Sequence, residues 1–334
     1  MSLPNTRDIC LGNCYRTRDA EGLEQCVRGS LTGTGISRFG FMEDNNTQKT
    51  ERWTIKSILE WTTGYFREKG IKTPRLDAEV LLAHALDTER LRLYLDFERP
   101  LSPDERNRFR ELVRRRASRE PVAYLVGKKE FWSVQIKTLP GVLIPRPETE
   151  VLVEVVLQKV RELPQPLIAE VGTGSGAVAV AILRENRQAV AIGTDVSIRC
   201  LEITRINARD SNTDDRLHLV ASNLLAAIQP AGQFDVICSN PPYIPTGVIT
   251  HLEPEVRDFE PHGALDGGAD GLDVIRNLVD QAPVYLKRGG WLVIEFGDGQ
   301  ETSVEELMTH GDRFRDVSIH RDLSGTPRIA KGVR

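Results

Sequence analysis

The chain has 334 residues, of which 40% are hydrophobic and 28% are charged, and its formal net charge is -4. This length is sufficient for two domains with a real core, and the composition is ordinary for a soluble globular protein. No stretch approaches the roughly 18 consecutive apolar residues of a membrane span, and residues 1–22 lack the apolar centre of a secretory signal. We therefore expect a cytoplasmic protein with no membrane partner.

The charge is unevenly distributed along the chain. Residues 53–145 carry 18 Lys and Arg against 13 Asp and Glu, whereas residues 146–334 carry 19 against 28. A basic front segment followed by an acidic one suggests two modules with different tasks.

The five cysteines, at positions 10, 14, 26, 200 and 238, predict neither disulfides nor a metal site. The count is odd, and the last two fall in a segment that we expect to be a buried α/β domain. Cys10, Cys14 and Cys26 have no histidine or fourth cysteine nearby, so their spacing does not match a zinc module. We interpret all five as unused thiols.

Residues 1–50 show no sustained hydrophobic period and are rich in Gly, Thr, Asn and Arg. We expect a poorly ordered extension there. Met42 stands directly ahead of the first helical pattern, so both Met1 and Met42 are possible starts.

A helical module is predicted over residues 51–125. Ile55, Ile58, Leu59 and Thr62 recur at helical spacing, and the segment TPRLDAEVLLAHALDT gives a second amphipathic helix. A third begins at Ser102, an N-cap followed by Pro103 and first-turn acids.

The third helix carries a run of arginines that we expect to face outward, including Arg114, Arg115 and Arg116. Phe109 and Val113 would pack inward. The arginine run is either a solvated face or a surface for an acidic partner, and the sequence leaves both interpretations open.

Residues 126–147 show strand alternation with proline punctuation, which predicts a hairpin linking two domains. From residue 148 to 334 the pattern changes. Strand-like segments at 167–171, 189–194, 217–221, 234–238 and 291–296 alternate with helical ones at 150–162, 176–186, 198–209 and 271–287. This alternation predicts a parallel sheet that is covered by helices on both faces.

A glycine-rich turn follows the first of these strands, in the segment AEVGTGSGAVAVAI. Gly172, Gly174 and Gly176 allow close backbone approach to a ligand, beside the electropositive start of a helix. The lack of a following Gly-Lys-Ser/Thr excludes a P-loop. The next strand ends in Asp195, a side chain suited to ribose hydroxyls. These two motifs predict an adenosine-type ligand and do not separate NAD from S-adenosylmethionine.

The stretch SNPPYIP ends the fourth strand of the series. Prolines cannot donate to a strand ladder, so Pro241 and Pro242 stop the strand. By itself the stretch favours the interpretation as a simple strand stop. At the carboxyl edge of a parallel sheet, where ligands bind, it also holds the Asn240 amide, the Pro241 carbonyl and the Tyr243 ring in fixed relation.

The three motifs together resemble the class I S-adenosylmethionine methyltransferases that methylate planar nitrogens. Two acceptors, the side-chain oxygen of Asn240 and the carbonyl of Pro241, are suited to grip the two N–H groups of an amide or amine and to favour the charge that develops on nitrogen. Tyr243 is suited to stack on the flat group and exclude water. Because the methyl group of the donor is already activated, this chemistry needs no metal.

The wider pattern of IPRPETE, NPPY and PEVRDFEP closely resembles the release factor glutamine methyltransferases, the PrmC/HemK family, from about Trp53 to Gly332. The resemblance implies a Rossmann-like sheet with a smaller N-terminal helical domain joined by a β-hairpin. It implies methyl transfer from S-adenosyl-L-methionine to N5 of the glutamine in the Gly-Gly-Gln loop of class 1 peptide chain release factors, in support of translation termination. The product of the donor would be S-adenosyl-L-homocysteine.

Carried onto this chain, the resemblance implies three sets of site residues. Those for the cofactor are Gly172, Thr173, Gly174, Ser175, Gly176, Asp195, Asn223, Leu224 and Asn240. Those for the substrate are Asn240, Pro241, Pro242 and Tyr243, and among these Asn240, Pro241 and Tyr243 are the catalytic ones. One position departs: Asn223 stands where the family usually has an acid beside adenine, which weakens one expected contact without removing an acceptor.

Four further charged residues lie near the motifs. Glu170 either meets the ammonium group of the cofactor or faces water, and Glu295 ends a buried strand near the site. Arg146 and Glu148 lie in a loop beside the expected cleft, with no assigned role.

Two alternative functions stay open at this point. An amino-methyltransferase acting on adenine in nucleic acid would use the same grip but needs a basic face, and the catalytic half is acidic. A binding module that kept only the fold would show a broken glycine loop or a missing Asn240, and this chain shows neither.

Overall fold

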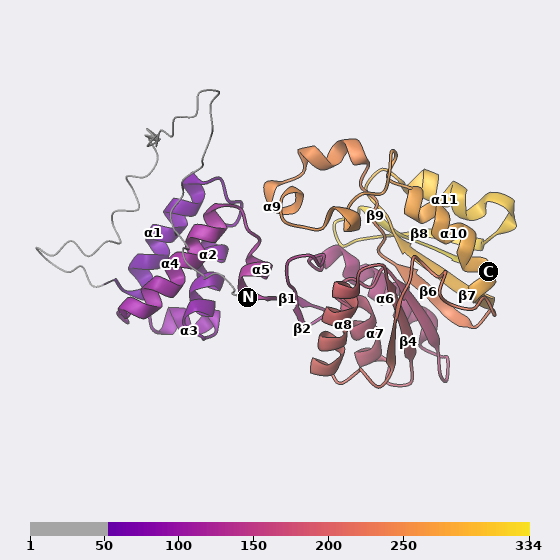
Figure 1. Ribbon diagram of the computed structural model, residues 1–334, viewed down its shortest axis with the longest axis horizontal. Helices are drawn as coiled ribbons and strands as arrows, with labels where there is room; N and C mark the ends of the chain where they lie inside the picture. The colour runs from indigo at the N-terminus through magenta and orange to yellow at the C-terminus, as the bar shows by residue number, and fades with distance from the viewer. Residues whose placement is uncertain (1–52) are drawn as a thin grey trace, which may run out of the picture. The chain divides into compact units, whose positions relative to one another are not determined.

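The computed structural model describes residues 53–334 (Figure 1). The expected extension at 1–50, with Met42 and the first three cysteines, lies outside the described residues. The other two cysteines, Cys200 and Cys238, are buried free thiols. No helix in the described part of the chain is both long and apolar enough to cross a bilayer.

The N-terminal part of the described chain is a helical module, as predicted. Its helices are α1 (Ile55–Glu68), α2 (Pro74–Ala85), α3 (Arg90–Leu95), α4 (Pro103–Ala117) and α5 (Val122–Val126). Helices α3 and α5 were not predicted, because six and five residues are too few to show a helical period. The long helices pack through buried side chains such as Ile58, Leu81 and Phe109.

Reciprocal caps fix the starts of α1 and α4. The Thr54 hydroxyl accepts from the Ser57 backbone N–H, and the Ser57 hydroxyl accepts from the Thr54 backbone N–H at 2.9 Å. Ser102 caps α4 in the same way with Glu105, whose carboxylate accepts from the Ser102 N–H at 2.8 Å. Such capping boxes satisfy backbone donors that a helix end otherwise leaves without partners. The predicted cap at Ser102 is confirmed.

The expectation that Arg114, Arg115 and Arg116 all face outward is wrong for Arg116, which is 6% exposed. Its guanidinium pairs with Asp77 on α2, with Nε and Oδ2 2.7 Å apart, and with Glu255, with Nη2 and Oε1 3.0 Å apart. The cause is helical spacing: residue 116 follows Phe109 by seven positions and so shares its buried face.

We predict that Arg116→Ala lowers the free energy of unfolding by about 3 kcal/mol, because it removes the buried cation of Asp77 and one of the two cations, Arg116 and Arg119, that pair with Glu255. Chemical denaturation measures the loss. The matched control is Arg114→Ala on the same helix, whose exposed side chain pairs with the exposed Glu111, and which should leave stability nearly unchanged. Equal small effects of the two substitutions would contradict the structural role of Arg116.

A short hairpin follows the helical module, as predicted. It consists of β1 (Lys128–Phe131) and β2 (Val134–Lys137), which pair antiparallel. Its two-residue turn places Trp132 and Ser133 at positive φ, 50° and 55°. Phe131 and Ile136 are buried in the core of the following domain, so the hairpin is anchored there.

The rest of the chain forms a mostly parallel sheet of seven strands, in the order β5-β4-β3-β6-β7-β9-β8, within the described residues. The strands are β3 (Leu167–Val171), β4 (Val190–Asp195), β5 (Leu217–Ala221), β6 (Phe234–Ser239), β7 (Leu286–Glu295), β8 (Arg315–Arg321) and β9 (Pro327–Val333). The first five are mutually parallel, which confirms the predicted sheet. The antiparallel pair β8 and β9 at the edge was not predicted.

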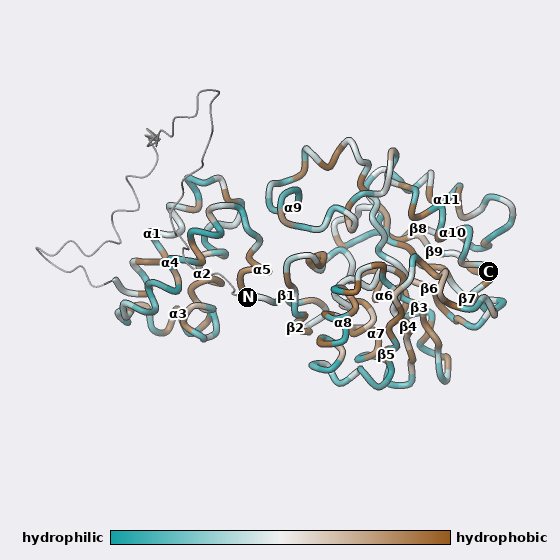
Figure 2. Tube along the Cα trace, in the orientation of Figure 1, coloured by the Kyte–Doolittle hydropathy of each residue, from teal (hydrophilic) through white to brown (hydrophobic). Residues whose placement is uncertain are grey.

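Helices cover both faces of this sheet. The helices of this part of the chain are α6 (Glu150–Val160), α7 (Ala177–Glu185), α8 (Ile198–Asp210), α9 (Pro254–Arg257), α10 (Asp273–Tyr285) and α11 (Glu301–Thr309), with short 3₁₀ turns at η2 (Pro147–Thr149), η3 (Thr246–His251), η4 (His262–Ala264) and η5 (His310–Asp312). The short α9 has no buried residue and does not belong to either covering layer. One core cluster joins the sheet to α6 and α7, and the other joins its opposite face to α10 and α11. The central strands β3, β4 and β6 are accordingly hydrophobic along most of their length (Figure 2).

Candidate active site

The carboxyl edge of the parallel strands brings the predicted motifs together. Val171, the last residue of β3, is in register with Thr194 on β4 and with Ser239 on β6. The Ser239 hydroxyl donates to the Val171 carbonyl at 2.7 Å, and the Gly172 N–H donates to the Thr194 carbonyl at 2.8 Å. The segments that contain the glycine turn, Asp195 and Asn240 therefore all begin at the carboxyl edge of the sheet, at the same level along the strands.

The glycine turn needs glycine at each of its three positions, because Gly172, Gly174 and Gly176 have φ of 73°, 57° and 77°. A Cβ on Gly176 would lie 2.5 Å from Cγ2 of Thr204 on α8, so this glycine permits close packing of two helices. A Cβ on Gly172 or Gly174 would meet nothing within 4 Å. The turn therefore presents bare backbone to open space at those two positions.

Thr173 and Ser175, between the glycines, turn inward and are buried. The Thr173 hydroxyl donates to Oε2 of Glu170 at 2.6 Å, and the Ser175 carbonyl accepts from the Asn207 amide at 2.8 Å. These bonds fix the shape of the turn from beneath.

Asp195 is buried at the end of β4 and organises two loops. Its Oδ2 accepts from the Gly174 N–H and its Oδ1 from the Ser197 N–H, each at 2.8 Å. A carboxylate oxygen has two lone pairs. Oδ1 and Oδ2 of Asp195 therefore each keep one acceptor position for a ligand hydroxyl.

Asn223 and Leu224 follow β5, the strand beside β4. Asn223 is exposed, and Leu224 is half-buried against the core with a positive φ of 51°. This left-handed backbone is uncommon for a leucine and costs on the order of 1 kcal/mol. The two side chains lie at the same edge of the sheet as the glycine turn.

The N-P-P-Y loop is held by side chains on both sides. Asn240 is half-buried, and its Nδ2 donates to the Thr149 hydroxyl at 3.0 Å. The Gln300 amide donates to the Tyr243 carbonyl at 3.0 Å, and the Tyr243 hydroxyl donates to Oε1 of Glu295 at 3.4 Å. Pro241 is buried. Sequence reasoning did not single out Thr149 or Gln300, although Thr149 lies inside the IPRPETE motif.

Glu170 is buried beneath the glycine turn, so the interpretation that it faces water is wrong. Burial, and to a smaller extent the charge of Asp195, raise its pKa to about 8, although hydrogen bonds from Thr173 and from the Ala179 N–H oppose the shift. Both bonds go to its Oε2, so Glu170 ties the turn to the first residues of α7.

Glu295, at the end of β7, is 1% exposed and lies beside the N-P-P-Y loop. Burial raises its pKa to about 7 against hydrogen bonds from the hydroxyls of Thr149 and Tyr243. The charge of Arg328 also lowers this pKa and that of Glu148 raises it. Its Oε2 has no hydrogen-bond partner in the described part of the chain.

Arg146 pairs with the buried Glu260, which also accepts from the Ile144 N–H at 3.1 Å. The pair fastens the loop before α6 to the segment that follows N-P-P-Y. Glu148 is exposed, and its negative charge raises the pKa of the nearby Glu295.

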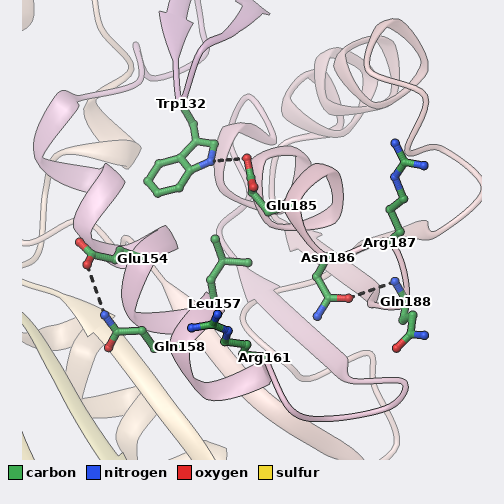
Figure 3. Close-up of a pocket in the computed structure, with 9 residues that line it drawn as sticks. All are labelled: Trp132, Glu154, Leu157, Gln158, Arg161, Glu185, Asn186, Arg187 and Gln188. Carbon is green, nitrogen blue, oxygen red and sulfur yellow. Dashed lines mark hydrogen bonds between the residues drawn. The ribbon is translucent and has the colours of Figure 1, made fainter.

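A separate pocket of about 640 Å³ lies at the opposite end of the sheet (Figure 3). It is lined by Trp132, Glu154, Leu157, Gln158, Arg161, Glu185, Asn186, Arg187 and Gln188. The Trp132 indole donates to Glu185 at 3.0 Å, and the 186–188 loop leads into the start of β4. None of the predicted site residues lines this pocket. Across residues 53–334, no group of three or more His, Cys, Asp or Glu is arranged to hold a metal ion.

Comparison with known proteins identifies the family. The model of the PrmC N-terminal domain matches residues 57–127, and that of the methyltransferase small domain matches residues 133–252. The release factor glutamine methyltransferase of Rhodopirellula baltica is 40% identical over 85% of this chain and 97% of its own length. That of Geobacter sulfurreducens is 42% identical over 86% and 99%. The chain belongs to the release factor glutamine methyltransferase family.

Members of this family are enzymes. The described part of this chain contains the class I methyltransferase fold. A crystal structure of the hMettl16 catalytic domain in complex with MAT2A 3′UTR hairpin 6 matches with a TM-score of 0.50 at 15% identity. The match covers 65% of this chain and 81% of that one. At this identity the likeness concerns the fold alone.

We predict that the buried Glu170 makes stability depend on pH. A carboxyl group whose pKa is raised from 4.5 to about 8 on folding stabilises the protein fully below its unfolded value. That contribution is lost as the pH rises through about 8. Glu170→Gln, which stays neutral, should therefore flatten the fall in the free energy of unfolding between pH 5.5 and 8.5, measured by urea denaturation.

The matched control for this prediction is Glu162→Gln, at an exposed position just after α6. It should keep the wild-type pH dependence. An identical fall in Glu170→Gln and wild type would show that the carboxyl group of Glu170 is ionised in the folded protein across this range.

Proposed function

We propose that the protein transfers a methyl group from S-adenosyl-L-methionine to N5 of the glutamine in the Gly-Gly-Gln loop of class 1 peptide chain release factors. The proposal includes a role in translation termination. The observation that carries it is the N-P-P-Y loop, which leaves the carboxyl edge beside the glycine turn and Asp195. The names of the relatives, release factor glutamine methyltransferases, support the substrate.

The residues at the carboxyl edge fit S-adenosyl-L-methionine. Gly172 and Gly174 border open space that any side chain would enter, and Asp195 keeps acceptor positions for two ribose hydroxyls. The turn from Gly172 to Gly176 would hold the donor at the start of α7, Asn223 and Leu224 would contact its adenine, and Asn240 would border the methyl group. Bound there, the cofactor supplies a methyl group activated by its positive sulfur.

The chain's own contribution to the reaction is to orient the substrate amide. An amide nitrogen is a poor nucleophile because its lone pair is delocalised into the carbonyl. Oδ1 of Asn240 and the carbonyl of Pro241 would accept the two N–H groups and stabilise the positive charge that grows as the carbon–nitrogen bond forms. The surplus proton on nitrogen is then lost to water. Tyr243 and Pro242 would cover the flat amide and exclude water.

The alternative substrate, adenine in nucleic acid, is less well supported. The segment that contains the site carries 19 Lys and Arg against 28 Asp and Glu, whereas nucleic-acid binding needs a basic face. We propose instead that residues 51–125 recognise the release factor, with 126–147 as the linker to the catalytic domain at 148–334. Because Arg116 is buried in ion pairs, only Arg114 and Arg115 of its run remain for that surface.

The test of this function is methyl transfer from labelled S-adenosyl-L-methionine to three substrates in parallel: a release factor, duplex DNA and RNA. We expect label in the release factor alone, and mass spectrometry should place one methyl group on the glutamine of the Gly-Gly-Gln peptide. Label in either nucleic acid and none in the release factor would overturn the proposal.

We predict that Asn240→Ala lowers turnover on the release factor by on the order of 100-fold, as loss of a positioning acceptor does. Calorimetry should show nearly unchanged cofactor affinity. Asp195→Ala is the matched comparison and should weaken cofactor binding by about 1.5–3 kcal/mol, the scale of a hydrogen bond to a charged group. Retained turnover with lost cofactor affinity in Asn240→Ala would assign the residue to the cofactor alone.

A further inference from the structure

The role proposed for Asn240 raises a geometric requirement that the loop alone does not meet. A side-chain amide has two orientations of almost the same shape, related by exchange of its oxygen and nitrogen. Only one of them presents an acceptor to a substrate N–H. The other presents an NH₂ group, which would face the substrate donors and repel them. Some neighbour must therefore select the orientation.

Thr149 is the neighbour in position to select it. The residue is 5% exposed, ends the 3₁₀ turn η2 and precedes α6. Its hydroxyl oxygen lies 3.0 Å from Nδ2 of Asn240, across 91 positions of sequence. A threonine hydroxyl carries a single proton, so it donates one hydrogen bond and accepts others. The partner that takes that proton decides what Thr149 offers to Asn240.

The buried carboxyl group of Glu295 is the acceptor for that proton, because the Thr149 hydroxyl lies beside it and lowers its pKa. An ionised carboxylate only accepts. With the Thr149 proton directed to Glu295, the hydroxyl oxygen can only accept from Asn240. The amide must then turn Nδ2 toward Thr149 and Oδ1 away from it.

We propose that Glu295 and Thr149 together fix the orientation of the Asn240 amide, so that its oxygen is presented to the substrate. The inference rests on the proposed function, because it takes Asn240 as the acceptor for the substrate amide. Both are positioning residues: they act through Asn240 and make no contact with the reacting atoms.

The buried setting of Glu295 makes this selection sensitive to pH. Its protonated form can donate to Thr149, which is then free to donate to Oδ1 of Asn240, so the reversed amide becomes equally satisfied. Burial places the pKa of Glu295 at about 7. The groups that face it are the Tyr243 hydroxyl, the exposed Glu148 and Arg328, while Arg146 and Arg328 face Tyr243. The selection is complete above this pKa and is lost below it.

The first test compares Thr149→Val, which has the shape of threonine without a hydroxyl, with Thr149→Ser, which keeps the hydroxyl. We predict that kcat for release factor methylation falls about tenfold in Thr149→Val and stays within about twofold of wild type in Thr149→Ser. Cofactor affinity should be unchanged in both. Equal loss in the two variants, or none in Thr149→Val, would overturn the proposal.

The second test is the pH profile, which a purely structural role would not alter. Wild-type kcat should rise as the pH passes through about 7, because ionised Glu295 is the selecting form. Glu295→Gln offers Thr149 a permanent NH₂ donor, so this variant should be slow and lack that rise. A wild-type profile that is retained in Glu295→Gln would contradict the assignment.

A third readout needs no methylation of any substrate. In a sample labelled with ¹⁵N asparagine, the side-chain NH₂ signals of Asn240, identified by their loss in Asn240→Asp, should shift with a midpoint near pH 7. The shift should be absent in Glu295→Gln. If this shift occurs while release factor goes unmethylated, the proposed function fails and the orientation mechanism stands. If release factor is methylated and the signals do not titrate, the mechanism fails alone.

Discussion

The register of β3 between β4 and β6 is the constraint on which the site depends. Because Val171 pairs with Thr194 on one side and with Ser239 on the other, three loops that are far apart in sequence leave the sheet at one edge. A slip of one residue would turn every strand side chain to the opposite face, so the two hydrophobic cores that cover the sheet also fix the site. The prolines of N-P-P-Y then end β6 where an amide and a carbonyl are needed.

Buried carboxyl groups are what this edge uses to hold its loops. Glu170 and Asp195 together accept the hydrogen bonds that shape the glycine turn, and Glu295 and Glu260 hold the segments around N-P-P-Y and IPRPETE. In a medium of low dielectric, a buried carboxyl group is either ionised beside hydrogen-bond donors or cations, or stays protonated. The groups around it therefore decide whether it carries a charge. The loops that would hold cofactor and substrate are thus held by hydrogen bonds and ion pairs to buried carboxyl groups, and all of them begin at one edge of the sheet.

Much of this arrangement could be predicted from the sequence, because it rests on local patterns. The spacing of hydrophobic residues predicted the parallel strands and the long helices, and Ser102 predicted the start of α4. The predicted strand ends placed Asp195 and Asn240 at one edge of the sheet. The features that the sequence did not predict depend mainly on contacts between residues that are far apart in the chain. The burial of Arg116 depends on Asp77 and Glu255, Thr149 acquires its role from Asn240 across 91 positions, and the β8–β9 pair has too weak an alternation to stand out. Helical spacing places Arg116 on the same face as Phe109, but no spacing rule identifies the partners that these side chains meet.

The account rests on Asn240 and Pro241 as the acceptors that orient a glutamine amide. A crystal structure of the protein with S-adenosyl-L-homocysteine and a Gly-Gly-Gln peptide tests this most directly. The account predicts the glutamine amide nitrogen within about 3.2 Å of both Oδ1 of Asn240 and the carbonyl oxygen of Pro241, facing the sulfur across the glycine turn. A glutamine bound elsewhere, with those two oxygens pointing to solvent, would contradict it.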